Sequence, residues 1–317
     1  MYTIGIDLGG TNIAAGIVND NYEIIQKDSV PTGADRPGEE IVKDMAALCK
    51  KIIADAGLTE ADIEYIGIAT PGTADSDTGV VVYANNLKFL DFPIADLLKK
   101  YIGIERVLIE NDANAAAKGE AIAGAAKGYA NSVMITLGTG VGGGIIIDNK
   151  VYSGFNHAGA ELGHIVIEYN GAQCSCGRKG CWEAYSSATA LIRMTREKIA
   201  EAGHSTKMWD MVGGNLDNVS GRTAFTAARE GDKAGQEVVD KYIGYLTSGL
   251  ASIINIFQPE VLSIGGGISN EKDNLLNPIK ERIKGETYSR DNIKATDIRI
   301  AQLRNDAGII GAAVLGR

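Results

Sequence analysis

Tyr2–Val18 reads YTIGIDLGGTNIAAGIV, and this stretch decides the fold. Two apolar, strand-like runs, Tyr2–Asp7 and Ile13–Val18, flank a turn rich in glycine. The same strand–glycine turn–strand unit returns at Val133–Ile147, which reads VMITLGTGVGGGIII. A unit that occurs twice predicts a chain of two halves built on one topology.

The rest of the chain alternates strand and helix patterns, which is typical of an α/β protein. Long helical patterns cover Glu39–Ala56, Cys181–Ala202 and Lys233–Phe257, and the chain closes with a strand over Ile298–Leu303 and a helix over Ala307–Leu315. In the second strand–glycine turn–strand repeat we expect a glycine turn over 138–144 and a strand only from 145 to 147. We expect a small domain over residues 1–115, completed by about 304–317, and a large domain over 116–303.

The two glycine turns suit phosphate binding. Glycines let backbone N–H groups approach phosphate oxygens, Thr11 adds a hydroxyl donor, and Asp7 can hold the water shell of Mg²⁺. Taken alone, either turn is better explained as an ordinary hairpin, and neither matches a Walker or Rossmann loop. Two matched hairpins facing each other across a cleft would hold a triphosphate, and Gly265-Gly266-Gly267 is a third glycine bend after a strand. Together they predict nucleotide binding.

A compact group of one histidine and three cysteines, which are soft metal ligands, follows the second repeat. His164, Cys174, Cys176 and Cys181 form a set that suits tetrahedral zinc, and the spacing argues against a simple cluster of free thiols. Four protein ligands leave no open position, so we expect a structural ion. Glu161 and Glu183 bracket the set; surface exposure is the default for Glu, but a fixed backbone here would let both accept hydrogen bonds from a ligand.

Composition excludes several classes of protein. The chain of 317 residues has 31 Lys and Arg against 40 Asp and Glu, a net charge of −9, which argues against a nucleic-acid surface. No apolar run approaches the ~20 residues of a membrane span, and we expect no secretion signal, because a strand-like run begins at Tyr2. Three crowded thiols and Cys49 on an apolar helical stripe fit a reducing compartment better than disulfides, so we expect a cytoplasmic protein.

Four motifs together resemble the bacterial glucokinases of the ROK family (repressors, open reading frames, kinases) over essentially the whole chain. They are Asp7–Asn12, Leu137–Gly144, Glu161-Leu162-Gly163-His164 and the Cys174/Cys176/Cys181 set. The resemblance implies two ribonuclease-H-like α/β domains of the actin and hexokinase type, closing over sugar and ATP in a central cleft. It also implies that the nucleotide and its Mg²⁺ are bound by Asp7, Gly9, Gly10, Thr11, Gly138, Thr139, Gly140, Gly265 and Gly266.

Asn111-Asp112 stands where a buried strand meets a helix. The residues alone favour Asp112 as a helix N-cap. The resemblance instead implies that Asp112 is the general base that takes the proton of the sugar 6-hydroxyl, with Asn111 as its sugar-binding neighbour.

The remaining sugar contacts follow from the resemblance alone. It implies that Glu161, Glu183 and His164 bind the hexose, His164 with its second ring nitrogen, and it matches Gly72 and Asn86 to loops on the sugar side. His157 and Ala160 depart from the glycines of many relatives. We expect His157 to be an exposed loop residue rather than a ligand, and its role stays open.

The sequence therefore predicts a kinase that converts glucose and MgATP to glucose 6-phosphate and ADP. N-acetylmannosamine kinase or another hexose kinase is the main alternative, because the sugar-contacting set is shared, and polyphosphate as donor stays open. A sugar-responsive repressor would need an N-terminal helix-turn-helix, for which we expect no room before Tyr2, and an inactive sugar-binding protein would not need Asp112. By resemblance we expect a homo-oligomer, a dimer or a tetramer.

Overall fold

The computed structural model describes all 317 residues, which form two compact units. Unit 1 comprises Met1–Met134, Gly144–Ala160 and Gln302–Arg317, and unit 2 comprises Ile135–Gly143 and Glu161–Ala301. The expected small domain over residues 1–115, completed by about 304–317, and the expected large domain over 116–303 stay a prediction. No helix of the structure combines the length and the apolar character that a membrane span requires.

Two five-stranded sheets carry the repeat that the sequence predicts. The first has the order β3-β2-β1-β4-β8 and the second β11-β10-β9-β12-β13. Counted along the chain, both read third, second, first, fourth, fifth, so the expectation of one topology used twice is confirmed. The strands are β1 Tyr2–Leu8, β2 Asn12–Val18, β3 Ile24–Pro31, β4 Ile63–Thr70, β8 Val107–Asn111, β9 Ser132–Leu137, β10 Val141–Ile147, β11 Lys150–Val151, β12 Val261–Gly265 and β13 Asp297–Ile300.

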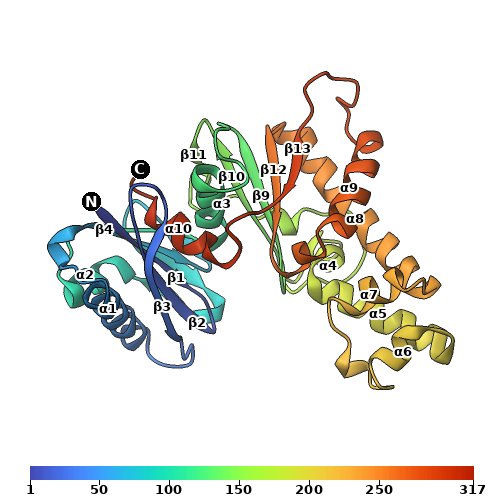
Figure 1. Cartoon of the computed structure of the whole chain (residues 1–317), viewed down its shortest axis with the longest axis horizontal. Coiled ribbons are helices and arrows are strands. Elements are labelled where there is room, and N and C mark those ends of the chain that lie inside the picture. Colours follow the sequence, from blue (N-terminus) through green and yellow to red (C-terminus); the bar gives the residue numbers. More distant parts are fainter. The chain divides into compact units, whose positions relative to one another are not determined.

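Alternation along β1 builds the two faces of the first sheet. Ile4, Ile6 and Leu8 point into a core shared with helices α1 (Gly38–Asp55) and α2 (Ile94–Ile102). Gly5 faces the other side, where α10 (Ala307–Ala313) lies, as the blue strands and the red helix show (Figure 1). A side chain at Gly5 would lie 1.8 Å from the carbonyl oxygen of Ile309, so the backbones of strand and helix are in direct contact.

Helix α10 also packs closely on α3 (Asp112–Ala123). A methyl group at Gly311 would lie 1.8 Å from the carbonyl oxygen of Ala115, so only glycine permits this approach. The chain enters α10 through a fixed segment, because the buried carboxylate of Glu120 accepts hydrogen bonds from the backbone N–H of Gln302 at 3.1 Å and of Leu303 at 2.7 Å.

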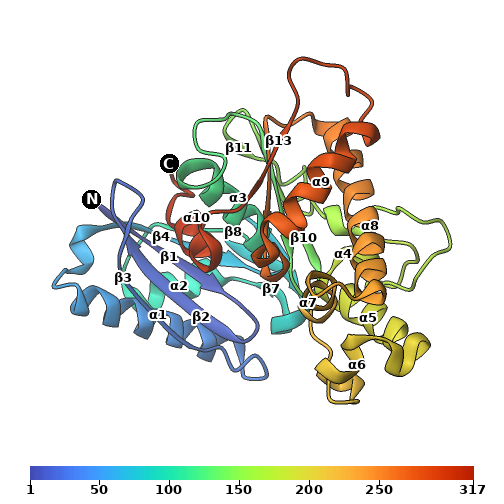
Figure 2. The same cartoon turned by 45° about the vertical axis from the view of Figure 1, so that its right-hand side comes forward.

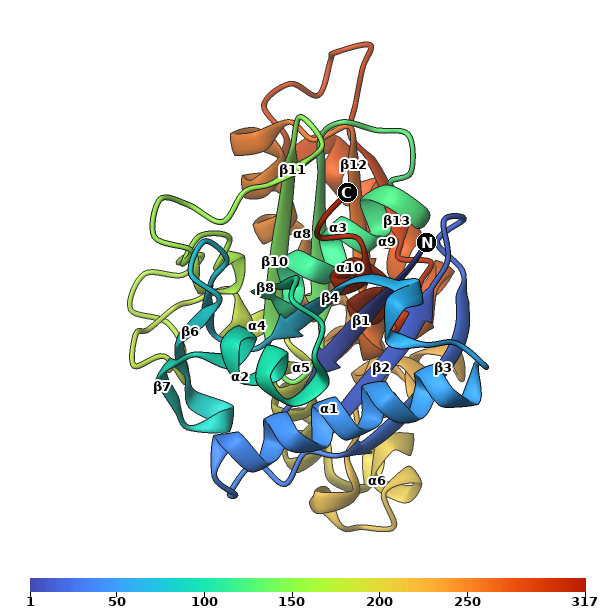
Figure 3. The same cartoon turned by 90° about the vertical axis from the view of Figure 1, so that its left-hand side faces the viewer.

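A small antiparallel sheet lies beside the large one in unit 1. It consists of β5 (Thr73–Asp75), β6 (Val80–Ala84) and β7 (Phe89–Phe92) in that order, and Figure 3 shows β6 and β7 together with the nearby helix α2. The sequence patterns did not predict this sheet, because its strands have only three to five residues each.

Unit 2 contains the remaining long helices, which Figure 2 shows side by side for α8 and α9. The predicted helix over Lys233–Phe257 is confirmed as α8. Trp182 is fully buried against it, because Gly249 leaves room for the indole ring. The other helices of the unit are α4 Glu183–Ser186, α5 Ala188–Ala202, α6 Lys207–Met211, α7 Thr223–Arg229 and α9 Asp273–Glu286.

Several predicted elements have different limits in the structure; the strand expected over Ile298–Leu303, for example, is β13 and ends at Ile300. The single helix expected over Cys181–Ala202 was wrong: Ser187 has an extended backbone and its side chain accepts a hydrogen bond from the N–H of Ala190, so a new helix begins there. The strand expected at 145–147 begins at Val141, so half of the expected glycine turn lies within β10. Gly144 is needed there because a methyl group would meet the carbonyl oxygen of Ala113 at 2.6 Å.

The contact between α10 and α3 generates a test of stability. We expect Gly311→Ala to lower the free energy of unfolding by about 2 kcal/mol or more, because the added methyl group has to push two helix backbones apart. Gly285→Ala is the matched control within α9, since nothing lies within 4 Å of its new methyl group. Urea unfolding measures both, and equal stability of the two variants would contradict the packing argument.

Candidate functional site

The first glycine hairpin, Leu8–Asn12, joins β1 to β2 in unit 1. The N–H of Gly9 donates to the carbonyl of Asn12 at 2.9 Å and closes the turn. A methyl group at Gly10 would lie 3.7 Å from Cβ of Asn86, so the structure brings Asn86 beside this hairpin, next to Gly10. Gly9, Gly10 and Thr11 thus occupy a turn whose backbone is open to a ligand.

Asp7, the penultimate residue of β1, lies close enough to Asp112 for the two carboxylates to repel each other. Burial, followed by the charge of Asp112, raises the pKa of Asp7 to about 6. Its carboxylate contacts the start of α10, where a methyl group at Gly308 would lie 2.6 Å from Oδ2. A partly buried acid beside a second acid favours a nearby cation.

Asn111, not Asp112, caps helix α3. Its Oδ1 accepts hydrogen bonds from the N–H groups of Ala113 at 2.9 Å and Asn114 at 3.2 Å, so the N-cap interpretation of Asp112 was wrong. Asp112 is the exposed first residue of the helix, where the helix dipole stabilises its negative charge. Asn111 is therefore the N-cap of α3, and the carboxylate of Asp112 lies at the start of the helix.

The amide group of Asn111 connects this junction to Gly72. Nδ2 of Asn111 donates to the carbonyl of Gly72 at 3.0 Å. Gly72 has φ +87°, and a methyl group there would overlap the carbonyl oxygen of Tyr83 at 2.0 Å, so glycine is required. The structure thus brings Gly72, Asn111 and Asp112 together.

Glu110 is a site residue that the sequence analysis missed. It is buried, and this burial raises the pKa of its carboxyl group. Its Oε1 accepts hydrogen bonds from the N–H of Asn111 at 2.9 Å and from Nδ2 of Asn114 at 3.1 Å, so it orients the residue that caps α3. An acidic residue within an otherwise apolar strand was the available signal.

In unit 2 the structure brings the four predicted metal ligands together. One ligand atom from each of His164, Cys174, Cys176 and Cys181 lies within 4.8 Å of all the others. Sγ of Cys176 and Sγ of Cys181 are 3.7 Å apart, and Nδ1 of His164 is 3.7 Å from Sγ of Cys174. Sulfurs bound tetrahedrally at about 2.3 Å lie about 3.8 Å apart, so this set fits a zinc ion.

The two ring nitrogens of His164 have different surroundings. Nδ1 faces the thiols, whereas Nε2 lies 4.0 Å from Oε2 of Glu161. The latter carboxylate is exposed, and so it is accessible to a ligand. The arrangement leaves Nε2 of His164 and the Glu161 carboxylate on the same side.

Glu183 connects the loop that carries Cys174 and Cys176 to the second glycine hairpin, Leu137–Val141. Its Oε2 accepts from the N–H of Val141 at 3.0 Å, and its Oε1 accepts from Oγ of Ser175 at 3.1 Å. A methyl group at Gly140 would lie 2.3 Å from Oε2, so glycine is required beside this carboxylate. Both oxygens of Glu183 thus have protein partners.

The second hairpin is also fixed by the start of α5 and by the bend after β12. The N–H of Ala188 donates to the carbonyl of Gly138, and Oγ1 of Thr189 donates to that of Thr139, both at 2.8 Å. Gly266, which follows Gly265 at the end of β12, has φ +81°, and a methyl group there would overlap the backbone of Leu137. The residues expected at the nucleotide therefore gather within unit 2 as they do within unit 1.

His157 is not the exposed loop residue that we expected. Its side chain is largely buried, with Nε2 3.2 Å from Oδ1 of Asp75 and 3.5 Å from Oδ2 of Asp77. These contacts hold His157 at a left-handed backbone position, φ +58°, which is uncommon for a residue other than glycine. Sequence reasoning missed the contact because its partners are distant in the chain.

Comparison with known proteins shows the family of this chain. The family model "ROK family" matches residues 3–317. The glucokinase of Halalkalibacterium halodurans is 37% identical over 314 residues, which cover 98% of this chain and 94% of that protein. The crystal structure of a ROK family glucokinase from Streptomyces griseus, in complex with glucose and AMPPNP, has a TM-score of 0.83 at 34% identity and covers 99% of both chains. The ribonuclease-H-like fold class expected from the sequence is thereby confirmed.

A more distant relative has a different role. The xylose repressor of Bacillus subtilis is 29% identical over 297 residues, which cover 91% of this chain but 70% of the repressor. The shared part thus occurs in proteins that are longer than this chain.

The raised pKa of Asp7 predicts a pH dependence of stability in the ligand-free protein. Between about pH 4 and 6 the folded protein binds a proton at Asp7 more readily than the unfolded chain, so this contribution to stability is lost as the pH rises through 6. We expect Asp7→Asn to be up to about 3 kcal/mol more stable than wild type at pH 8. Urea unfolding with EDTA measures the difference, which should vanish toward pH 4; a difference that does not depend on pH would contradict the assignment.

Proposed function

This chain belongs to the ROK family, and we propose that it is a glucokinase that transfers the γ-phosphoryl group of ATP to the 6-hydroxyl of glucose. The observation that carries the proposal is the placement of Asp112 at the start of α3, close to Asp7 and within the same unit as the first glycine hairpin. Phosphoryl transfer requires positioned phosphates, charge neutralisation and one base. The first glycine hairpin, Asp7 and Asp112 would supply these three in turn.

Asp112 acts as the general base. Its carboxylate accepts the proton of the 6-hydroxyl while that oxygen attacks the γ-phosphorus, the bond from the phosphorus to the β,γ-bridging oxygen breaks, and ADP leaves. Exposure at the first residue of a helix makes the carboxylate accessible to a substrate. The capping by Asn111 and the support from Glu110 hold the helix start in one geometry.

Asp7 would hold the Mg²⁺ that accompanies ATP through its water shell, and the ion would neutralise charge on the phosphates. The partial burial of Asp7 beside Asp112 supports this role, because a cation removes the repulsion between the two acids. Gly9, Gly10 and Thr11 supply backbone and hydroxyl donors to the phosphates, as do Gly138, Thr139 and Gly140. Gly265 and Gly266 form the remaining bend at the nucleotide.

The sugar is oriented by polar groups around Asp112 and around the Cys/His cluster. Asn111 keeps one Nδ2 hydrogen beyond its bond to Gly72, and Asn86 adds an amide. Glu161 and Nε2 of His164 offer an acceptor and a ring nitrogen, and Glu183 would also contact the hexose. Zinc bound by His164, Cys174, Cys176 and Cys181 would be structural, since it fixes the loop from which these groups project.

Glucose is our first choice of hexose because the Streptomyces griseus relative was crystallised with it. N-acetylmannosamine kinase activity is the alternative within the same mechanism. Turnover measured with glucose, mannose, fructose and N-acetylmannosamine, with ATP or polyphosphate as donor, ranks the substrates. Absence of glucose turnover with ATP would exclude the proposed function.

Removing the base should abolish turnover without unfolding the protein. We expect Asp112→Asn to lower kcat by about a hundredfold to ten-thousandfold. Asp273→Asn is the matched control, because Asp273 is likewise the first residue of its helix, α9, and loses the same favourable interaction with the helix dipole. Coupled kinetics and thermal unfolding measure both variants; an Asp112→Asn enzyme with wild-type kcat would contradict the assignment.

The Cys/His cluster predicts a stoichiometric metal. We expect one zinc per chain in the wild type, and in Cys176→Ser we expect loss of zinc together with a rise of at least tenfold in KM for glucose. Cys49→Ala is the control, since Cys49 lies in the core of unit 1, outside the cluster, and the variant should retain its zinc. Elemental analysis and kinetics test this. Unchanged glucose affinity in a zinc-free variant would contradict the role of the ion.

A further inference from the structure

Thr32 contacts both sides of the first glycine hairpin. It follows β3 directly and is fully buried. Its Oγ1 donates to the carbonyl of Gly9 at 2.6 Å, and its backbone N–H donates to the carbonyl of Thr11 at 2.8 Å.

These two hydrogen bonds fix the orientation of two peptide planes. In a trans peptide the C=O and N–H groups point in opposite directions. Because the carbonyls of Gly9 and Thr11 point to Thr32, the N–H groups of Gly10 and Asn12 point away from it. A phosphate bound by these N–H groups would therefore approach the turn from the side opposite Thr32.

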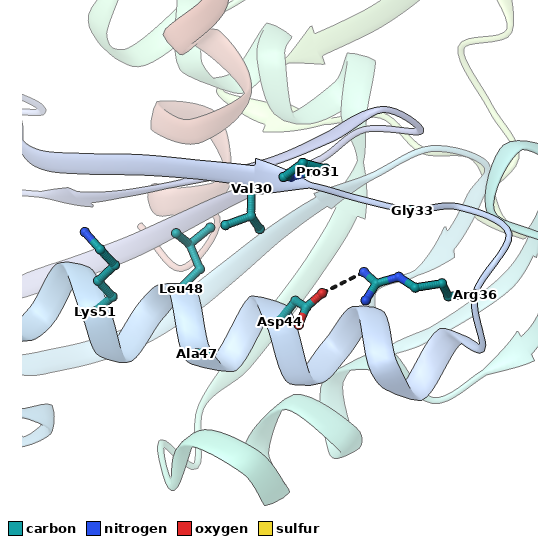
Figure 4. A pocket seen from close by; sticks show the side chains of 8 residues that line it. All are labelled: Val30, Pro31, Gly33, Arg36, Asp44, Ala47, Leu48 and Lys51. Atoms are coloured by element: carbon teal, nitrogen blue, oxygen red, sulfur yellow. Dashed lines mark hydrogen bonds and ion pairs between the residues drawn. The ribbon is translucent and has the colours of Figure 1, made fainter.

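Thr32 is itself held by Arg36. One terminal nitrogen of Arg36 donates to the carbonyl of Thr32 at 2.8 Å and to Oδ2 of Asp44 at 2.6 Å. Figure 4 shows this Arg36–Asp44 pair at the groove of about 470 Å³ between the end of β3 and α1. The chain reaches this geometry through Gly33, which has φ +59° and adjoins the guanidinium group.

We infer that Thr32 is a positioning residue for ATP, which acts by orienting the hairpin Leu8–Asn12, and that Arg36 keeps Thr32 in place. The inference rests on the proposed function, because it assigns the residue that sets the phosphate contacts of that same site. It predicts an effect on the nucleotide and none on the sugar.

Thr32→Val is the informative variant, since it removes the hydroxyl and keeps the branched shape. We expect its KM for ATP to rise about threefold to tenfold, the effect of one lost hydrogen bond, with KM for glucose unchanged. Thr32→Ser restores the hydroxyl and should behave as wild type. Arg36→Gln leaves the hydroxyl in place and should give a smaller rise in KM for ATP, which provides a second test if Thr32→Val does not fold.

Amide hydrogen exchange provides a readout that does not depend on activity. The N–H of Gly9, bonded to Asn12, should exchange faster in Thr32→Val than in wild type. A wild-type protein without ATP turnover would overturn the proposed function, and the exchange rates would still test Thr32. Unchanged exchange together with unchanged KM for ATP, or an equal rise in KM for both substrates, would overturn the inference.

Discussion

The backbone contact of α10 with its neighbours is the constraint on which unit 1 depends. Three glycines permit it: Gly5 in β1, Gly67 in β4 and Gly311 in α10 itself, each with less than 2 Å between its missing methyl group and a carbonyl oxygen across the contact. The elements so joined carry the two acids of the site, Asp7 on β1 and Asp112 on α3. Their separation therefore depends on these close backbone contacts, which a close-packed interior keeps from shifting.

Each unit contains, at its candidate site, a titratable group whose pKa is raised by its surroundings. In unit 1 the carboxyl group of Asp7 lies in a partly buried position beside a second acid. In unit 2, burial and the neighbouring thiols raise the pKa of Cys181 to about 12, although a metal ligand has to be a thiolate. A cation bound in unit 1 would relieve the repulsion between Asp7 and Asp112, whereas a metal ion bound in unit 2 would have to displace the proton of Cys181.

The sequence was sufficient for features that rest on local patterns. The repeat of strand, glycine turn and strand predicted both sheets, and the spacing of Cys174, Cys176 and Cys181 from His164 predicted the ligand cluster. Features that depend on contacts between distant segments were missed. The contact of His157 with Asp75 is one of them, because these two residues are far apart in the chain. Thr32 and Glu110 carried no motif, and their roles appear only when the fold brings Gly9 and Asn111 to them.

Local reasoning also failed where two adjacent residues compete for one role. Both Asn111 and Asp112 are good N-caps, and the sequence does not say which side chain turns back to the helix N–H groups. The structure gives the cap to Asn111, whose Oδ1 accepts from the N–H groups of Ala113 and Asn114. Among the helix N–H groups, Oδ1 of Asp112 accepts only from that of Ala113, at 2.8 Å. At Ser187 the sequence did not show that a cap was present. This residue lies within a continuous helical pattern, and its capping divides the predicted helix into two helices.

Phosphorus NMR of the product formed from glucose and ATP tests the central claim most directly. The account predicts a new sugar phosphate resonance that is split by the two protons of C6, with ADP appearing in equal amount. A phosphate on another carbon, or loss of ATP with only inorganic phosphate as product, would contradict it.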